Sequence, residues 1–340
     1  MRGHSSALCL LLSALCVSSG CPSEVAYAPL NWTDTLGGSE PGWLMNVHAR
    51  AYDERYALGG SLESGAIWRF DGEAWTPLEL GLELPLLNWI HADASETLVA
   101  VGRGGSALHF AEGAWRLRET PTEQTLWGVW GSSMDALWAV GGDAIASEER
   151  RGVVLRWEGQ AWTRMELPET LNAGEIYAWF KVWGSGPQDV YIVGQRGALL
   201  HWNGVEWDEI PLGTTKDLIA LWGLDADHVA LVGGRNNGVV ARWDGASWLL
   251  RDMSPMPGLN GVWMRDASSI HVAGNYGTLA VLDFETLETV EELSLETMDD
   301  LHALHGSPEG VLTAVGGNLL SQGSGGFRGI AYHRALVEGE

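Results

Sequence analysis

The chain has 340 residues, of which 44 are acidic, only 20 are Lys or Arg, and 19 are Trp. A formal charge of −24 argues against nucleic acid or anionic lipid as a partner, because no basic surface is left to displace counterions from phosphates. Apolar residues at 46%, together with 45 glycines and the many indoles, indicate a turn-rich β protein that packs through tryptophan.

The first 21 residues have the organisation of an export signal. Arg2 precedes an apolar run over residues 7–17 that is too short to cross a bilayer. The run ends in Ser-Ser-Gly-Cys, which resembles a bacterial lipobox with Ser in place of its usual first Leu. We expect acylation of Cys21, with simple secretory cleavage as the alternative. Residues 22–340 would then be an exported domain at the bacterial cell envelope, attached to a membrane only through its lipid and facing the periplasm or the cell surface.

Seven units repeat along the rest of the chain. In each unit an apolar run ends in a glycine, and an aromatic or imidazole ring stands eleven residues before that glycine. A fixed offset in every unit is the mark of a repeat architecture. The glycines are Gly59, Gly102, Gly141, Gly194, Gly233, Gly274 and Gly316. The rings are His48, His91, Trp130, Trp183, Trp222, Trp263 and His305.

A third element follows the glycine in the first five units. It is a short apolar run, then an acidic or Asn residue, Gly and, two or three positions later, Trp. Each unit therefore predicts four short strands, and a unit of about 40 residues with four strands is one propeller blade. The seventh unit lacks its outer strand, which residues 31–36 resemble. The sequence thus predicts an all-β, seven-bladed β-propeller whose N-terminal strand completes the last blade and closes the ring.

Residues 182–207 carry the repeat almost whole. They read Val-Trp-Gly-Ser, a turn, Asp-Val-Tyr-x-Val-Gly, then Gly-x-Leu-Leu-His-Trp-x-Gly-x-x-Trp. This pattern resembles the tryptophan-rich propeller repeats of myxobacterial-type bacterial lipoproteins over about residues 40–335. The resemblance implies a propeller fold and an envelope lipoprotein. It implies no particular activity, because propellers serve many roles.

Longer loops are predicted to gather on one face of the propeller. Loops that join the second strand to the third, and one blade to the next, share a face, and two of them are extended, at residues 143–151 and 168–177. The Gly-rich residues 318–327 belong to the same face, which we call the insertion face. Such clustering is typical of a binding surface, and neutral loop drift is the alternative. The candidate ligand-binding residues of these loops are Asp143, Glu148 and Tyr177.

Further candidates lie near the start of the inner strands. Trp89, Trp127, Trp179 and Lys181 are expected toward the mouth of the central channel on the insertion face. Aromatic rings there would stack on sugars or hold a peptide, and burial in the core is the alternative.

Three ring positions hold imidazoles in blades that become neighbours when the propeller closes. His305, His48 and His91 belong to units seven, one and two. Neutral imidazoles converging from adjacent strands would hold Zn²⁺ or Cu²⁺. The alternative is that each His replaces Trp as a flat packing ring.

Catalytic motifs are missing from the sequence. It contains no Gly-x-Ser-x-Gly, His-Glu-x-x-His, phosphate-loop or dinucleotide-binding pattern. The acidic run over residues 285–300 is expected to be a solvated outer edge of blade six. We therefore expect a non-catalytic binding scaffold for a protein, peptide or glycan, with no cofactor assigned. The alternatives are a polysaccharide hydrolase or lyase, a metal-binding propeller, and a structural ring within a larger envelope assembly.

Overall fold

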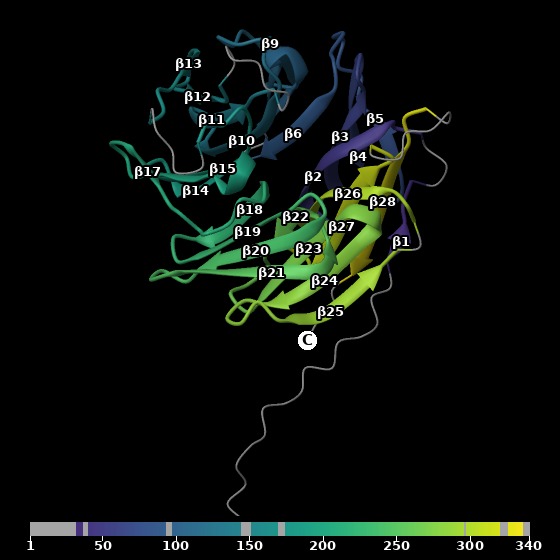
Figure 1. Ribbon diagram of the computed structural model, residues 1–340. Coiled ribbons are helices and arrows are strands. Elements are labelled where there is room, and N and C mark those ends of the chain that lie inside the picture. The colour runs from purple at the N-terminus through teal and green to yellow at the C-terminus, as the bar shows by residue number, and fades with distance from the viewer. Residues whose placement is uncertain are drawn as a thin grey trace, which may run out of the picture.

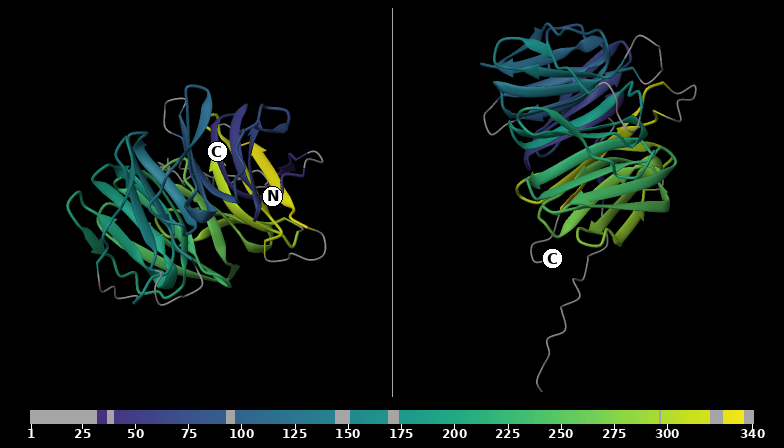
Figure 2. Two further views of the ribbon diagram at one scale, coloured as in Figure 1. Left: turned by 90° about the horizontal axis from the view of Figure 1, so that it is seen from above. Right: turned by 60° about the vertical axis from the view of Figure 1, so that its left-hand side comes forward.

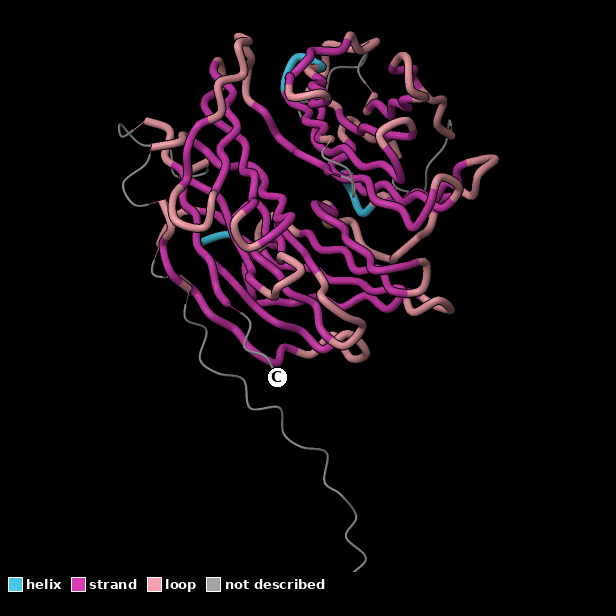
Figure 3. The backbone as a smooth tube through the Cα atoms, turned by 180° about the vertical axis from the view of Figure 1, so that it is seen from behind, coloured by secondary structure: helices cyan, strands magenta, loops and turns pink. Residues whose placement is uncertain are grey.

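The computed structural model describes residues 32–36, 40–92, 97–143, 151–168, 174–295, 297–319 and 326–335. Within these ranges the chain forms seven four-stranded antiparallel sheets, and its only helical segments are three short 3₁₀ turns (Figure 3). The predicted all-β, seven-bladed propeller is confirmed. The signal segment, including Cys21, lies outside the described residues.

Each sheet is one blade, and its strands run in order from the central channel outward. Blades 1 to 3 consist of β2 (Trp43–Ala51), β3 (Glu54–Ser61), β4 (Ser64–Phe70) and β5 (Trp75–Pro77); β6 (Leu87–Ala92), β7 (Leu98–Gly102), β8 (Ala107–Ala111) and β9 (Ala114–Arg118); and β10 (Leu126–Ser133), β11 (Ala136–Gly141), β12 (Val153–Trp157) and β13 (Trp162–Arg164).

Blades 4 to 6 consist of β14 (Trp179–Gly186), β15 (Asp189–Gly194), β16 (Leu199–Trp202) and β17 (Trp207–Glu209); β18 (Leu218–Asp225), β19 (His228–Gly233), β20 (Asn237–Trp243) and β21 (Trp248–Pro257); and β22 (Leu259–Trp263), β23 (Ser269–Gly274), β24 (Thr278–Asp283) and β25 (Thr289–Ser294). Blade 7 joins β26 (Asp300–Gly306), β27 (Val311–Gly317) and β28 (Gly329–Ala335) to β1 (Thr33–Asp34). The 3₁₀ turns are η1 (Arg103–Gly105), η2 (Gln195–Gly197) and η3 (Asn275–Gly277).

The N-terminal strand closes the ring as predicted. β1 pairs antiparallel with β28, with Thr33 opposite His333 and Asp34 opposite Tyr332. The purple and yellow ends of the described chain therefore meet in one blade (Figures 1 and 2). Every inner strand also contacts the inner strand of the next blade, and β26 contacts β2, so the cycle is complete.

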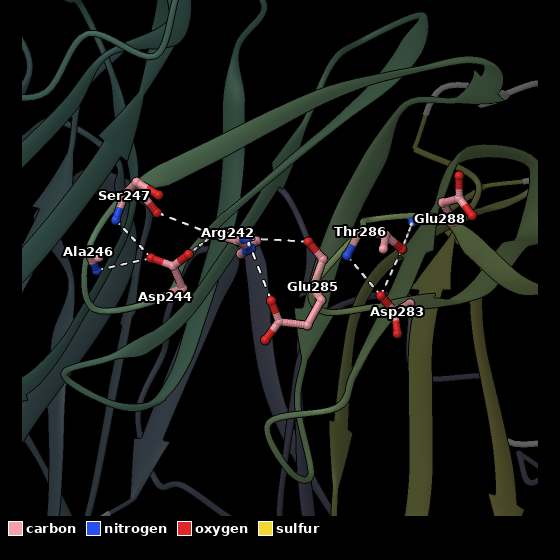
Figure 4. Close-up of polar contacts among 8 residues, drawn as sticks. All are labelled: Arg242, Asp244, Ala246, Ser247, Asp283, Glu285, Thr286 and Glu288. Carbon is pink, nitrogen blue, oxygen red and sulfur yellow. Dashed lines mark hydrogen bonds and ion pairs between the residues drawn. The ribbon is translucent and has the colours of Figure 1, made fainter. Parts of the chain in front are cut away.

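The repeated Asp-Gly or Asn-Gly pair forms the turn between the third and fourth strands. In blade 5 the Asp244 carboxylate accepts hydrogen bonds from the backbone N–H groups of Ala246 (3.0 Å) and Ser247 (2.8 Å) (Figure 4). The following Gly245 has φ +84°, a conformation that glycine adopts without strain. This geometry explains the Asp-Gly or Asn-Gly pair before the outer strands of blades 1, 4 and 5, whereas blades 2 and 3 carry Glu-Gly at the same place.

Blade 6 lacks this glycine and closes its turn differently. The Asp283 carboxylate accepts from the backbone N–H of Thr286 at 2.8 Å, and the outer strand β25 follows. Arg242 of blade 5 joins the two blades, because it donates to Asp244 at 2.5 Å and to the backbone oxygen of Glu285 at 3.3 Å (Figure 4). The acidic stretch forms the predicted exposed outer edge of blade 6 along β25. The prediction is wrong for its end, because Asp299 and Asp300 are 2% and 1% exposed and Asp300 begins the inner strand of blade 7.

The hydrophobic core lies between the blades. Each of its clusters combines buried residues from two neighbouring blades. The ring residue of one blade packs on a small residue of the next. A Cβ placed on Gly223 of blade 5 would come within 2.3 Å of the Trp183 indole of blade 4, so this position requires glycine. The recurring Trp is therefore an inter-blade packing group.

Candidate functional site

All seven inner strands share one irregularity. The pairing of each inner strand with the second strand of its blade skips one residue, three positions before the ring residue. A β-bulge of this kind leaves the extra residue out of the ladder and re-aims its side chain. The bulged residues are Met45, Asn88, Trp127, Phe180, Ile219, Asn260 and His302.

All seven bulged residues line one cavity of about 380 Å³, which we call the central pocket. The remaining lining residues are Lys181, Gly234, Arg235, Asn236, Asn275, Asp300 and Leu319. Residues 234–236 and 275 follow second strands, so the pocket opens on the insertion face. Its volume falls in the range of sites that take small ligands or chain segments rather than folded domains.

Lys181 is the most unusual polar group of the pocket. Its ammonium donates to the backbone oxygen of Trp127 at 3.0 Å and lies 4.2 Å from the centre of the Trp89 ring. Gly128 leaves room for it, since a Cβ there would come within 3.4 Å of the Lys181 Cδ and 2.9 Å of the Phe180 oxygen. Burial lowers the pKa of Lys181 to about 7, because the charged form loses its hydration.

Asparagine side chains brace the pocket wall. Asn88 donates to the backbone oxygen of Leu126 in the next blade at 2.8 Å. Asn260 donates to the backbone oxygen of Leu301 at 3.0 Å and to the Asn275 side chain at 2.8 Å. These bonds tie blade 2 to blade 3 and blade 6 to blade 7 at the depth of the bulges. The pocket is therefore held by rigid strands.

The lining includes buried polar atoms that have no hydrogen-bond partner among the described residues. Among them are the Asn88 Oδ1 and the His302 Nε2. Burial, together with the nearby Lys181, lowers the pKa of His302 to about 4, so this imidazole is neutral at pH 7. Because unpaired buried polar atoms are costly, they point to groups that a ligand or ordered water satisfies.

Arg235 forms the rim of the pocket. It pairs with Asp217 at 2.8 Å, and its guanidinium lies 5.4 Å from the centre of the Phe180 ring. Its charge is thus already offset by a carboxylate, unlike that of Lys181. The pocket combines an apolar lining, neutral amides, the buried Asp300, whose carboxylate accepts from the Tyr276 backbone N–H at 3.2 Å, and Lys181, which forms no ion pair in the described ranges.

The similarity to known proteins is one of fold. No protein-family model matches the chain, and no curated protein matches its sequence. Among solved structures it is similar to the WD40 β-propeller domain of Doa1, with a TM-score of 0.69, 9% identity, and 90% of this chain and 98% of that one covered. It is also similar to YCF48 bound to D1 peptide, with a TM-score of 0.63, 13% identity, and coverage of 92% and 99%. YCF48 from Cyanidioschyzon merolae gives 0.65 at 13% identity, with coverage of 89% and 98%.

The structure separates the four residues predicted at the channel mouth. Trp127 and Lys181 line the central pocket. Trp89 lies under the Lys181 ammonium and packs against the core. Trp179 is not at the mouth: it is 1% exposed and occupies the position that Leu holds in the other six units. That position faces the space between blades, where Trp179 lines a smaller cavity of about 120 Å³ beside the insertions.

The described ends of the two insertions lie together, as the sequence predicts. Gly142 and Ala178 form a β-bridge, and Arg151 lies 3.8 Å from Glu175. The Asp143 carboxylate is at the base of the first insertion, 3.5 Å from the backbone nitrogen of Thr125. The Tyr177 hydroxyl, at the base of the second, donates to Glu175 at 2.7 Å. Neither residue lines the central pocket, and Glu148 lies outside the described residues.

The three ring histidines are brought together at the junction of blades 7, 1 and 2. The centre of the His48 ring lies 4.5 Å from that of His305 and 6.3 Å from that of His91. The Ala49 backbone N–H donates to the His305 Nδ1 at 3.3 Å, and the His91 Nε2 lies 3.0 Å from the backbone oxygen of Gly131. Burial lowers the pKa of His48 and His305, the latter to about 4, so both are in the neutral form that binds metals.

Other chemistry finds less support in the structure. In the part of the chain that is described, no group of three or more His, Cys, Asp or Glu side chains is arranged to hold a metal ion. The three-histidine metal site stays a prediction. No described helix is long and apolar enough to cross a membrane. Asp300 is the one carboxylate among the described residues of the pocket, whereas glycoside hydrolysis commonly uses two.

The sequence analysis did not recognise the bulged position as one that all seven blades share. Its seven residues have no side-chain type in common, so a search for similar residues at equal spacing passes over it. The feature that marks this position in the sequence is its constant distance of three residues before the ring residue. That offset, combined with the rule that bulges re-aim side chains, would have found it.

Proposed function

We propose that this protein is a non-catalytic binding scaffold that takes a peptide segment of a partner protein into the central pocket. The observation that carries the proposal is the bulge in all seven inner strands, which turns one side chain from every blade into the same cavity. Bulges are designed features of a fold rather than defects, and here they build a site.

The lining suits a peptide. Met45, Trp127, Phe180 and Ile219 provide apolar and aromatic surface, and Asn88 and His302 provide polar atoms for backbone groups. YCF48, a propeller of similar fold, has been solved bound to D1 peptide, which supports a peptide as the occupant here. A glycan is the alternative that Trp127 and Phe180 also suit, since sugars stack on aromatic rings.

The cell envelope is the place we propose for this scaffold. The lipobox-like residues before Cys21 support a lipid anchor. With Cys21→Ser we expect the protein to leave the membrane fraction and become soluble. If the variant still sediments with membranes, lipid on Cys21 is not what holds the protein there.

The binding proposal is tested on an array of 15-residue peptides probed with residues 22–340. Ile219→Trp fills the pocket mouth, and we expect it to abolish the signals that the wild type gives. The matched control is Val205→Trp, which places the same indole on an 82% exposed turn of the opposite face and is expected to bind normally. Peptides that bind equally to both variants would show that the central pocket is not the site.

A further inference from the structure

Lys181 and Lys216 are the only lysines in the sequence. Lys216, which is partly exposed, pairs with Asp252 at 2.7 Å, as a lysine near the surface of an acidic protein is expected to do. Lys181 instead sits in the central pocket, against a backbone oxygen and the face of an indole. The acidic chain thus places one of its two ammonium groups where no described carboxylate forms an ion pair with it, since Asp300 of the same pocket accepts instead from the Tyr276 backbone N–H.

A buried ammonium without a counter-ion is costly. The energetic penalty of removing the charge from water is recovered only by an opposite charge and good hydrogen bonds. The Trp127 oxygen and the Trp89 ring provide only part of the stabilisation that would offset this penalty. A single anionic group entering the pocket would complete the environment of Lys181. A dianion such as phosphate fits less well, because the guanidinium of Arg235 is already paired with Asp217.

We propose that the central pocket binds the C-terminal carboxylate of its peptide, with Lys181 as the residue that pairs with it. The inference rests on the proposed function and names the part of the peptide that enters. The Asn88 Oδ1, buried and without a partner in the described ranges, accepts the N–H of the last residue, and its orientation is fixed because the Asn88 amide nitrogen donates to Leu126. Met45, Phe180 and Ile219 surround the last side chain, which is therefore apolar.

A chain end fits this cavity better than an internal acidic residue does. At a C-terminus the carboxylate, an amide N–H and the side chain all branch from one carbon atom, which brings the three complementary groups into one compact unit. An Asp or Glu side chain holds its carboxylate away from the backbone. An internal residue would also require the peptide chain both to enter and to leave a pocket of only about 380 Å³.

The pair of lysines makes the test direct. Protein labelled with ¹³C at lysine Cε gives two signals, and Lys216 is the internal control. The probes are three pools of acetyl-Ala-Ala-X tripeptides, where X is Leu, Ile, Val, Phe, Met or Trp. One pool has a free carboxylate, the second is amidated, and the third is amidated with Glu in the middle position. We expect the free acids to shift the Lys181 signal and to bind about tenfold or more tightly than the amides.

The pH dependence gives a second readout. The free Lys181 has a pKa of about 7, and a bound carboxylate raises it. The dissociation constant of the free acids is therefore constant between about pH 5 and 7 and rises by up to about tenfold per unit above pH 7, since binding must then take up a proton. Lys181→Met removes both the preference for the acid and this dependence, and Lys216→Met leaves both unchanged.

Each other outcome overturns the inference in a distinct way. Acids and amides that bind equally would leave the peptide scaffold intact but refute the carboxylate contact. Binding of the Glu pool as tight as that of the acids would refute the C-terminal source. If no pool binds at millimolar concentration, the carboxylate anchor is wrong, whereas the scaffold itself is judged separately by the array and Ile219→Trp.

Discussion

Replacing Trp183 with Ala tests the packing that joins blade to blade. The Trp183 indole is 7% exposed and belongs to a cluster with Leu221, Val229 and other residues of blades 4 and 5. Truncation of a buried Trp to Ala costs roughly 3–5 kcal/mol of unfolding free energy. For residues 22–340, a domain of about 320 residues, the entropy of unfolding near the midpoint is about 0.7 kcal/mol per degree. We therefore expect the melting temperature to fall by about 4–8 °C.

The assay is thermal unfolding of residues 22–340 followed by circular dichroism, with Val205→Ala as a matched surface control that is 82% exposed in the wild type. A second variant, Gly223→Ala, sharpens the test, because its Cβ would come within 2.3 Å of the Trp183 indole. Gly223→Ala destabilises the wild type but is tolerated in the Trp183→Ala background, where the space is open. A Trp183→Ala protein as stable as Val205→Ala, or additive effects of the two core changes, would refute this account of the packing.

Three further predictions concern closure, pH and metal. Deleting residues 30–38 removes β1 and exposes the edge of β28, so we expect loss of a cooperative thermal transition; an unchanged transition would mean that the other three strands of blade 7 suffice. Burial holds the pKa of His109, His271, His302 and His305 at about 4, below the ordinary 6.5 of the unfolded chain. Between pH 6.5 and 4 the unfolded state therefore binds more protons than the folded state. The urea midpoint should fall as the pH is lowered from 6.5 to 4, and the contribution of these histidines should level off below pH 4. Equal midpoints at pH 7 and 4.5 would contradict the burial. If the ring histidines hold metal, elemental analysis should give about one equivalent of Zn or Cu that His48→Ala loses, and no metal after incubation with both ions would leave these residues as packing groups.

The fold was accessible from the sequence because its determinants repeat with constant spacing. Second strands such as β7, β15 and β19 end at the recurring glycine, and outer strands such as β5 and β17 begin at the recurring Trp. Inter-blade packing and the close approach of neighbouring strands constrain these positions in every blade, and a turn glycine precedes the outer strand in the first five. Seven repetitions made the signal stronger than any single propensity would be.

The site was only partly accessible, because a ligand constrains the pocket as a whole and not each blade alike. Lys181 and Trp127 were found through their place near the start of inner strands, whereas Asn88 and Asn260 were passed over. Trp179 was misplaced because its residue type was weighed above its position, which is Leu in the other units and buried in every blade.

The most direct test of the central claim follows the pocket itself while a peptide binds. Met45 is the bulged residue of blade 1 and lines the central pocket, whereas Met298 is 68% exposed elsewhere. Protein with ¹³C-methyl methionine is titrated with a peptide from the array, and the Met45 signal is assigned with Met45→Leu, a volume-conserving change. The account predicts that the Met45 methyl shifts with the same saturation curve as binding while Met298 does not move. A peptide that binds with full occupancy and leaves the Met45 signal in place would contradict it.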